Sequence, residues 1–165
     1  GAIEVPVIAA VEGICFGGGL AMVAFCDFRV AAETARFAAP EVAVGLHMTW
    51  HSVPRLVRLV GAQATRRLLM LDTEWSANQA LSLGFVDEVV PTGQAVDAAS
   101  NMAKAIAARP RLATRFVKRG IEAATHGGDT LLSMPDSDLL LAMSIGDDFR
   151  KGRTRLMDRK KVPKS

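Results

Sequence analysis

Three consecutive glycines, Gly17–Gly19, stand between two apolar segments and constrain the fold more than any other feature of the sequence. The run before them, Val5 to Val11 (VPVIAAV), is rich in β-branched residues and predicts a buried strand of a parallel sheet. The segment after them, Leu20 to Phe25, is apolar on all sides and predicts a short buried helix. We therefore expect Gly13 through Gly19 to form the turn that joins the strand to the helix.

The backbone of such a turn can bind a carbonyl oxygen or an anion. Glycine allows positive φ and close approach to a ligand, and the helix that follows presents unpaired N–H groups and the positive end of its dipole. A carbonyl oxygen placed there is polarised, and an anion formed there is stabilised. Glycine-rich turns also pack helices against strands without any ligand, so the glycines alone leave both interpretations open. Leu20 follows them where a phosphate loop needs Lys, and Asp27 comes too early for a dinucleotide fingerprint.

The pattern along the chain changes from alternating strands and helices to helices alone near Pro91. Further strands are expected at Asp27 to Ala32, Arg36 to Ala38 and Phe85 to Val90. Helices are expected at Trp50 to Val60, ended by Gly61, at Ala62 to Met70, and at Ala77 to Leu83, capped by Ser76 and ended by Gly84. The later helices are expected over residues 93–108, 112–124, 129–145 and 149–161.

This pattern predicts an α/β core over residues 1–91, which carries the glycine turn, and a helical region over residues 92–165. Three or four strands are too few to form a well-covered parallel sheet alone. We therefore expect that strands are missing from this chain or that another chain supplies them.

Charge and cysteine content exclude several classes of protein. The net charge of +3 does not by itself argue for nucleic acid. From Arg150 to Lys164 there are eight Lys or Arg against one acid, which favours a solvated helix end, then a phosphate contact, over a nucleic-acid patch. Cys15 and Cys26 form no zinc motif and are expected to be buried free thiols in a reducing cytoplasm. No run of 18 apolar residues predicts a membrane span.

Three segments in one order resemble a known family. The string PVIAAVEGICFGGGLAMVAFCDFRVAAETARFAAPEVAVG resembles the central motif of the crotonase superfamily, the enoyl-CoA hydratase/isomerase family. EWSANQALSLGFVDEVVP resembles its helix-turn-strand segment, and DDFRKGRTRLMDRKK its C-terminal helix. The resemblance implies a crotonase-like (ClpP/crotonase) ββα superhelix core followed by a C-terminal helical oligomerisation region. It covers the later part of that domain; the earlier strands and the loop with the first oxyanion donor have no counterpart here.

The resemblance implies an acyl-CoA thioester substrate, in which coenzyme A is part of the substrate and no separate cofactor is needed. Gly18 matches the glycine whose backbone N–H is one of two oxyanion donors. Gly17 and Gly19 flank it and let the turn approach the thioester. Lys160, in the final helix, is a candidate contact to a CoA phosphate. The resemblance also implies a homo-oligomer, a trimer or a hexamer, with a companion chain or missing N-terminal part as a further possibility.

Acid residues decide which reaction the resemblance implies. Hydratases of the family hold and activate a water between two glutamates; one position is occupied here by Ala21 and the other by Glu41, which follows Pro40. A single acid that moves a proton between the α and γ carbons resembles the isomerases, so β,γ to α,β enoyl-CoA isomerisation through Glu41 is the leading hypothesis. The alternatives are a hydratase, another crotonase-type lyase or hydrolase, and a non-catalytic fragment or subunit that needs a partner chain for the first half of the site.

Two histidines follow Glu41 where hydratases carry a Pro-Gly-rich loop. His47 and His51 are four residues apart, a spacing that suits a metal pair on a helix. No third ligand is evident, so no metal is expected. His47 is a candidate for the substrate site, as an auxiliary acid–base group beside Glu41. The simpler interpretation is that both histidines are ordinary loop or helix residues.

Overall fold

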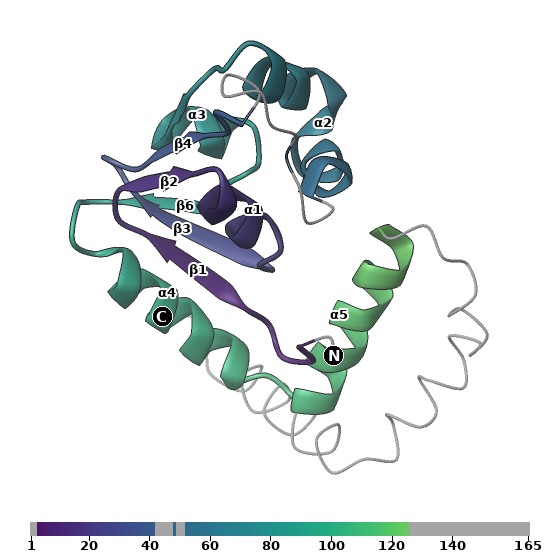
Figure 1. Ribbon diagram of the computed structural model, residues 1–165. Helices are drawn as coiled ribbons and strands as arrows, with labels where there is room; N and C mark the ends of the chain where they lie inside the picture. Colours follow the sequence, from purple (N-terminus) through teal and green to yellow (C-terminus); the bar gives the residue numbers. More distant parts are fainter. Residues whose placement is uncertain (1–2, 42–47, 49–51, 126–165) are drawn as a thin grey trace, which may run out of the picture. The chain divides into compact units, whose positions relative to one another are not determined.

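Two three-stranded sheets carry the glycine turn in the computed structural model, which describes residues 3–41, 48 and 52–125 (Figure 1). The first sheet has the order β1-β3-β6, and all its strands are parallel. The second has the order β2-β4-β5, in which β2 and β4 are parallel and β5 is antiparallel. The strands are β1 (Ile8–Val11), β2 (Ile14–Phe16), β3 (Phe28–Ala32), β4 (Arg36–Ala38), β5 (Trp75–Ser76) and β6 (Glu88–Val90).

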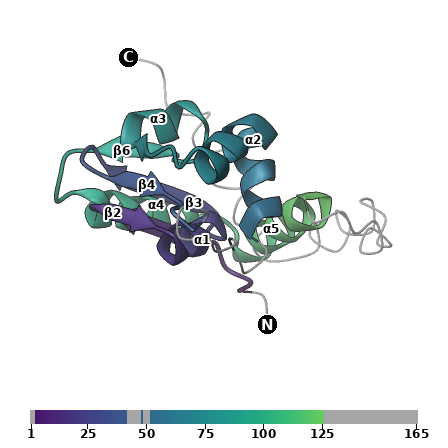
Figure 2. The same cartoon turned by 45° about the horizontal axis from the view of Figure 1, so that its top comes forward.

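A ββα unit occurs twice in succession. β1 and β2 are followed by α1 (Gly18–Ala24), and β3 and β4 by α2 (Ser52–Met70). The second pair of strands lies parallel to the first, with Ile8 opposite Phe28 and Ile14 opposite Arg36. The ββα repeat and the α/β class expected from the resemblance are therefore present; Figure 2 shows the same strands from another side.

Residues on β3 alternate between two cores, as neighbouring residues of a strand must. Ala31 belongs to the larger core, which includes Leu20 and Phe37. Val30 faces the smaller one, with Ala95 and Ala99 of α4 (Ala95–Ala107). The helices α1 and α4 therefore pack on opposite faces of the first sheet (Figure 1).

Several predicted boundaries shift for local reasons. The first strand begins at Ile8 and not at Val5, because the N–H of Val7 bonds to Asp27 Oδ2 at 2.7 Å and Pro6 has no N–H. The prediction of one turn from Gly13 through Gly19 is wrong, since Ile14–Phe16 forms a strand within it. The break predicted at Gly61 is confirmed as a kink with φ 79° inside α2.

The helix α3 (Ala77–Ser82) begins as predicted. Ser76 Oγ accepts from the N–H of Gln79 at 3.3 Å, and Gln79 Oε1 accepts from the N–H of Ser76 at 2.9 Å. This reciprocal arrangement is a capping box. The start of α4 is fixed differently, because the carboxylate of Glu12 accepts from the N–H groups of Gly93 and Ala95 at 2.8 and 2.7 Å.

Contacts divide the chain into two compact units, of which Pro6–Ala103 contains both sheets. In the other, Glu4 pairs with Arg115 of α5 (Arg111–Thr125), and Lys118 Nζ donates to the carbonyl of Val5 at 2.9 Å. The predicted division at residue 91 stays a prediction. The helices predicted over residues 129–145 and 149–161 lie outside the described residues. None of the described helices has the length and apolar character to cross a membrane.

Candidate active site

The glycine turn is fixed by the pairing of the two strands on either side of it. Phe16 lies opposite Ala38 in the second sheet, and the N–H of Gly17 donates to the carbonyl of Ala38 at 2.9 Å. The carbonyl of Gly17 then accepts from the N–H of Ala21 at 2.9 Å. Gly17 itself has φ 54° and ψ −118°, a conformation that L side chains rarely adopt. The strand β4 thus sets where α1 begins.

The N–H groups just after Gly17 are available to a ligand. Among the described residues, nothing accepts a hydrogen bond from the N–H of Gly18, Gly19 or Leu20. No side chain caps α1, and its first turn has no acidic residue. Gly18 and Gly19 are exposed. The backbone therefore presents neighbouring unused donors at an accessible surface, the arrangement that binds an anionic or polarised oxygen.

Glu41 lies directly against this turn. A β-carbon on Gly17 would come within 2.7 Å of Glu41 Oε1, so the carboxylate occupies space that only a glycine leaves free. The other oxygen, Oε2, is buried and has no hydrogen-bond partner among the described residues. A buried carboxylate oxygen without a partner is uncommon. The structure therefore brings together Gly17 and Glu41, two residues that the sequence analysis assigned to one site.

The other face of α1 is closed by packing. Ala21 is buried in the larger core beside Leu20 and Ala24. Cys15 lies beneath the turn, since a β-carbon on Gly19 would be 3.8 Å from its Sγ. Burial, and secondarily the neighbouring Cys26, raises the pKa of the Cys15 thiol to about 11. The thiol is protonated at neutral pH, so it is not a nucleophile. Neither cysteine forms a disulfide within the described residues, and the half-buried Cys26 donates from its Sγ to the carbonyl of Met22 at 3.8 Å.

The remaining site predictions lie elsewhere. His47, His51 and Lys160 are outside the described residues, so their assignments stay predictions. Within residues 3–41, 48 and 52–125, no group of three His, Cys, Asp or Glu gathers as metal ligands would.

Sequence reasoning gave no role to Arg29, although it is the buried cation of this region, with a relative exposure of 3%. Desolvation lowers the pKa of its guanidinium, while Asp87 opposes that effect. The one signal in the sequence is a basic residue within a segment, Asp27 to Ala32, that was predicted to be a strand.

The sequence and the fold both match known proteins. The family model for enoyl-CoA hydratase/isomerase matches residues 2–164. The mevalonyl-coenzyme A hydratase sidH of Aspergillus fumigatus is 33% identical over 162 residues, which are 94% of this chain and 58% of that protein. The crotonyl-CoA hydratase of Syntrophomonas wolfei is 32% identical over 164 residues, 98% of this chain and 62% of its own length.

A solved structure with the same fold is enoyl-CoA hydratase subunit I from Geobacillus kaustophilus, with a TM-score of 0.86 and 27% identity. The match covers 99% of this chain and 63% of that one. The chain therefore spans about three fifths of the length of these relatives. With a family model that extends over nearly all its residues and a glycine turn set against Glu41, the chain belongs to the enoyl-CoA hydratase/isomerase family.

Proposed function

We propose that this protein processes acyl-CoA thioesters, with the N–H of Gly18 stabilising the negative charge that forms on the thioester oxygen. The observation that carries the proposal is the contact between Glu41 and the glycine turn, with one carboxylate oxygen lacking a partner. The carboxylate can act as a base, and the unused backbone N–H groups beside it can polarise the thioester carbonyl. Removing a proton next to a thioester carbonyl requires both.

The leading reaction is isomerisation of a β,γ-enoyl-CoA to the α,β isomer. The Glu41 carboxylate takes a proton from the α carbon, and the electron pair moves toward the thioester oxygen to give a dienolate. The N–H of Gly18 stabilises that oxyanion. Glu41, now protonated, returns the proton to the γ carbon, and the double bond shifts from the β,γ to the α,β position. No water, oxidant or second acid takes part.

Ala21 favours isomerisation over hydration. Adding water requires one group to orient the water and one to accept its proton, and the second acid position is occupied by a buried methyl group. The names of the relatives favour the alternative, because both the Aspergillus and the Syntrophomonas proteins are named hydratases. Hydration of an α,β-enoyl-CoA is therefore the second candidate, with Glu41 as the only carboxylate assigned to it.

The proposal includes a second oxyanion donor from polypeptide outside these 165 residues. The relatives are longer than this chain. A homo-oligomer, a trimer or a hexamer, remains our expectation for the assembled protein.

Glu41→Gln tests the proton shuttle. We assay the purified protein with trans-3-hexenoyl-CoA for isomerisation and with crotonyl-CoA for hydration. Glu41→Gln keeps the shape of the side chain but cannot accept a proton, so kcat for isomerisation should fall about 10²–10⁴-fold, the usual contribution of a general base. Glu33→Gln is the matched control, because Glu33 is exposed on the turn between β3 and β4.

The two substrates separate the candidates. Isomerisation that depends on Glu41 supports the leading reaction, and water addition without isomerisation supports the hydratase. Unchanged isomerisation in Glu41→Gln contradicts the shuttle. If neither substrate is converted and the intact mass shows no companion chain, the protein is not an enzyme by itself.

A further inference from the structure

Arg29 connects the end of α1 to the segment before β6. From its position on β3, its Nη1 donates to the carbonyls of Cys26 at 2.8 Å and Val23 at 3.3 Å. Its Nε donates to the carbonyl of Phe85, and its guanidinium lies 5.5 Å from the centre of the Phe85 ring. One planar side chain thus contacts two parts of the unit that are far apart in the sequence.

The position of Arg29 is itself determined by Asp87. Asp87 Oδ2 accepts from the N–H of Arg29 at 2.7 Å, and the N–H of Asp87 donates to the carbonyl of Arg29 at 2.9 Å. The same carboxylate oxygen is 3.8 Å from Nη2. A buried guanidinium needs partners for its donors, and here backbone carbonyls provide most of them.

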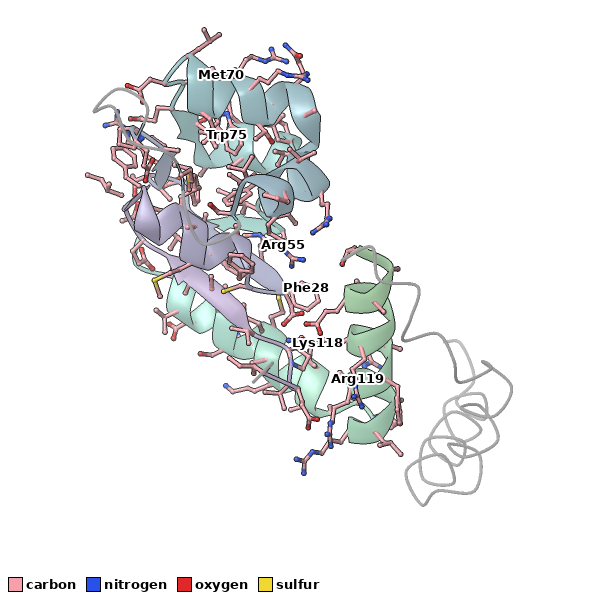
Figure 3. All side chains as sticks on the ribbon, turned by 45° about the vertical axis from the view of Figure 1, so that its right-hand side comes forward. Phe28, Arg55, Met70, Trp75, Lys118 and Arg119 are labelled. Atoms are coloured by element: carbon pink, nitrogen blue, oxygen red, sulfur yellow. The ribbon has the colours of Figure 1, made fainter. Side chains whose placement is uncertain are left out.

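A second arginine reaches the same end of α1. The Nε of Arg55, on α2, donates to the carbonyl of Ala24 at 2.9 Å, and Figure 3 shows this side chain extending toward the end of the unit where Phe28 begins β3. The two arginines together bind the carbonyls of Val23, Ala24 and Cys26. The carbonyl of Val23 also accepts from the N–H of Cys26 at 3.1 Å, so at this carbonyl Arg29 adds to a backbone bond. The carbonyls at the end of a helix need such partners from outside it.

The two ends of α1 are therefore held in different ways. At its start, the backbone bond from Gly17 to Ala38 holds the turn, and the next N–H groups have no partner among the described residues. At its finish, two guanidinium groups bind three carbonyls. Because α1 has only seven residues, a shift of its last turn changes the direction of the N–H groups in its first turn.

We propose that Arg29 is a positioning residue for the proposed site, and that with Arg55 it sets the direction in which the Gly18 N–H points. The inference rests on the proposed function, since it gives that N–H a thioester oxygen to polarise. Arg29 touches neither substrate nor Glu41 in this scheme. It acts through α1, and its contribution is geometric precision at the oxyanion donor.

Infrared difference spectra of bound [1-¹³C]butyryl-CoA test the proposal without turnover. Hydrogen bonds to the thioester oxygen lower the frequency of its carbonyl band, so the band reports polarisation directly. Arg29→Lys keeps the charge but cannot donate in the planar fork that these carbonyls use. We expect its carbonyl band to return at least halfway to the frequency in water, with butyryl-CoA still bound. For the reaction itself, kcat should fall about tenfold with little change in KM, less than the loss of a whole donor.

Arg55→Lys is the second variant, and Arg36→Lys is the control. Arg55 is half-buried and binds one of the three carbonyls, so its effect should be in the same direction and smaller. Arg36 is exposed and pairs with Glu74, so its variant should leave the carbonyl band unchanged. If Arg29→Lys does not fold, as judged by thermal unfolding, the Arg55→Lys spectrum decides.

The unmodified protein separates the two proposals. If it binds butyryl-CoA and the carbonyl band does not move from its frequency in water, the oxyanion site itself is absent and the proposed function fails. If the band moves in the unmodified protein and equally in both arginine variants, the positioning role is wrong and the proposed function stands. A band that moves in the unmodified protein and relaxes in the variants supports both.

Discussion

Gly17 and Gly61 show two different reasons for a glycine beside or within a helix. Both have positive φ, 54° at Gly17 and 79° at Gly61. A β-carbon at Gly61 would meet no described atom within 4 Å, whereas one at Gly17 would meet the Glu41 carboxylate at 2.7 Å. At Gly61 the only reason for a glycine is the positive φ that the kink of α2 needs. Gly17 also needs a positive φ, and in addition its missing side chain leaves room for the Glu41 carboxylate. We therefore assign a functional role to Gly17 and not to Gly61.

Gly17→Ala should have the largest effect. An alanine here is forced into a conformation that costs on the order of 1–3 kcal/mol in stability, and it must also move Glu41 or the turn. Because both halves of the proposed site shift, kcat/KM should fall at least about 10²-fold, as for the loss of an oxyanion donor. Urea unfolding and the enoyl-CoA assays measure the two effects separately.

A double-mutant cycle identifies the part of the Gly17→Ala destabilisation that comes from the contact with Glu41. In a Glu41→Ala background the carboxylate is gone, so Gly17→Ala should destabilise the protein less than it does beside Glu41, and the remaining loss reports backbone strain alone. Equal losses in the two backgrounds would mean that the approach of Glu41 to Gly17 does not constrain position 17.

Gly61→Ala should have a smaller and purely structural effect. At φ 79° and ψ 161° the residue lies in a region of backbone conformation that is essentially restricted to glycine, so an alanine there costs on the order of 1–3 kcal/mol in stability. The proposed site is carried by other elements. We expect the urea midpoint to fall while kcat/KM for the enoyl-CoA substrate stays the same. A loss of activity comparable to that of Gly17→Ala, in a protein that remains folded, would show that the kink of α2 also shapes the site and would end the contrast between the two glycines.

The order of elements in the larger unit could be predicted because it depends on local signals. Val5 to Val11 predicted a strand by its β-branched residues, and Ser76 and Gly61 marked a helix start and a helix break that the structure has. Ile14–Phe16 was missed because three residues between glycines give no periodicity. The two-residue strand β5 was missed for the same reason, since only its pairing with β4 defines it.

The site was predictable only in part, because its geometry is tertiary. Glu41 and Gly17 were assigned to one site through the family resemblance, but no spacing in the sequence predicts a 2.7 Å approach between them. That approach follows from the register that sets Phe16 opposite Ala38. Arg29 was missed because a lone charge in an apolar strand looks like an exception, and its partners are carbonyls, which every residue carries.

Ionisation of Cys15 should affect stability only at alkaline pH and should leave the stability at neutral pH unchanged. Its sulfur packs beneath Gly19, and burial raises its pKa from 9.0 to about 11. Below pH 9 the thiol keeps its proton in both the folded and unfolded chain, so it adds no pH dependence. Between pH 9 and pH 11 the unfolded chain has lost that proton while the folded protein keeps it. The free energy of unfolding must then fall as pH rises, by at most about 1.4 kcal/mol per pH unit.

Cys15→Ala should remove this slope, whereas Cys26→Ala, which takes away the half-buried thiol, should leave most of it. The chain has no Tyr, so the other side chains that titrate in this range are mainly lysines, and they are common to all three proteins. Urea unfolding at pH 8, 9, 10 and 11 measures the difference. If the unmodified protein and Cys15→Ala lose stability in parallel, the thiol is not shielded in the folded state. The packing beneath Gly19 would then be loose, and the turn would be held by the Gly17–Ala38 bond, the two arginines and the buried residues of α1, Leu20, Ala21 and Ala24.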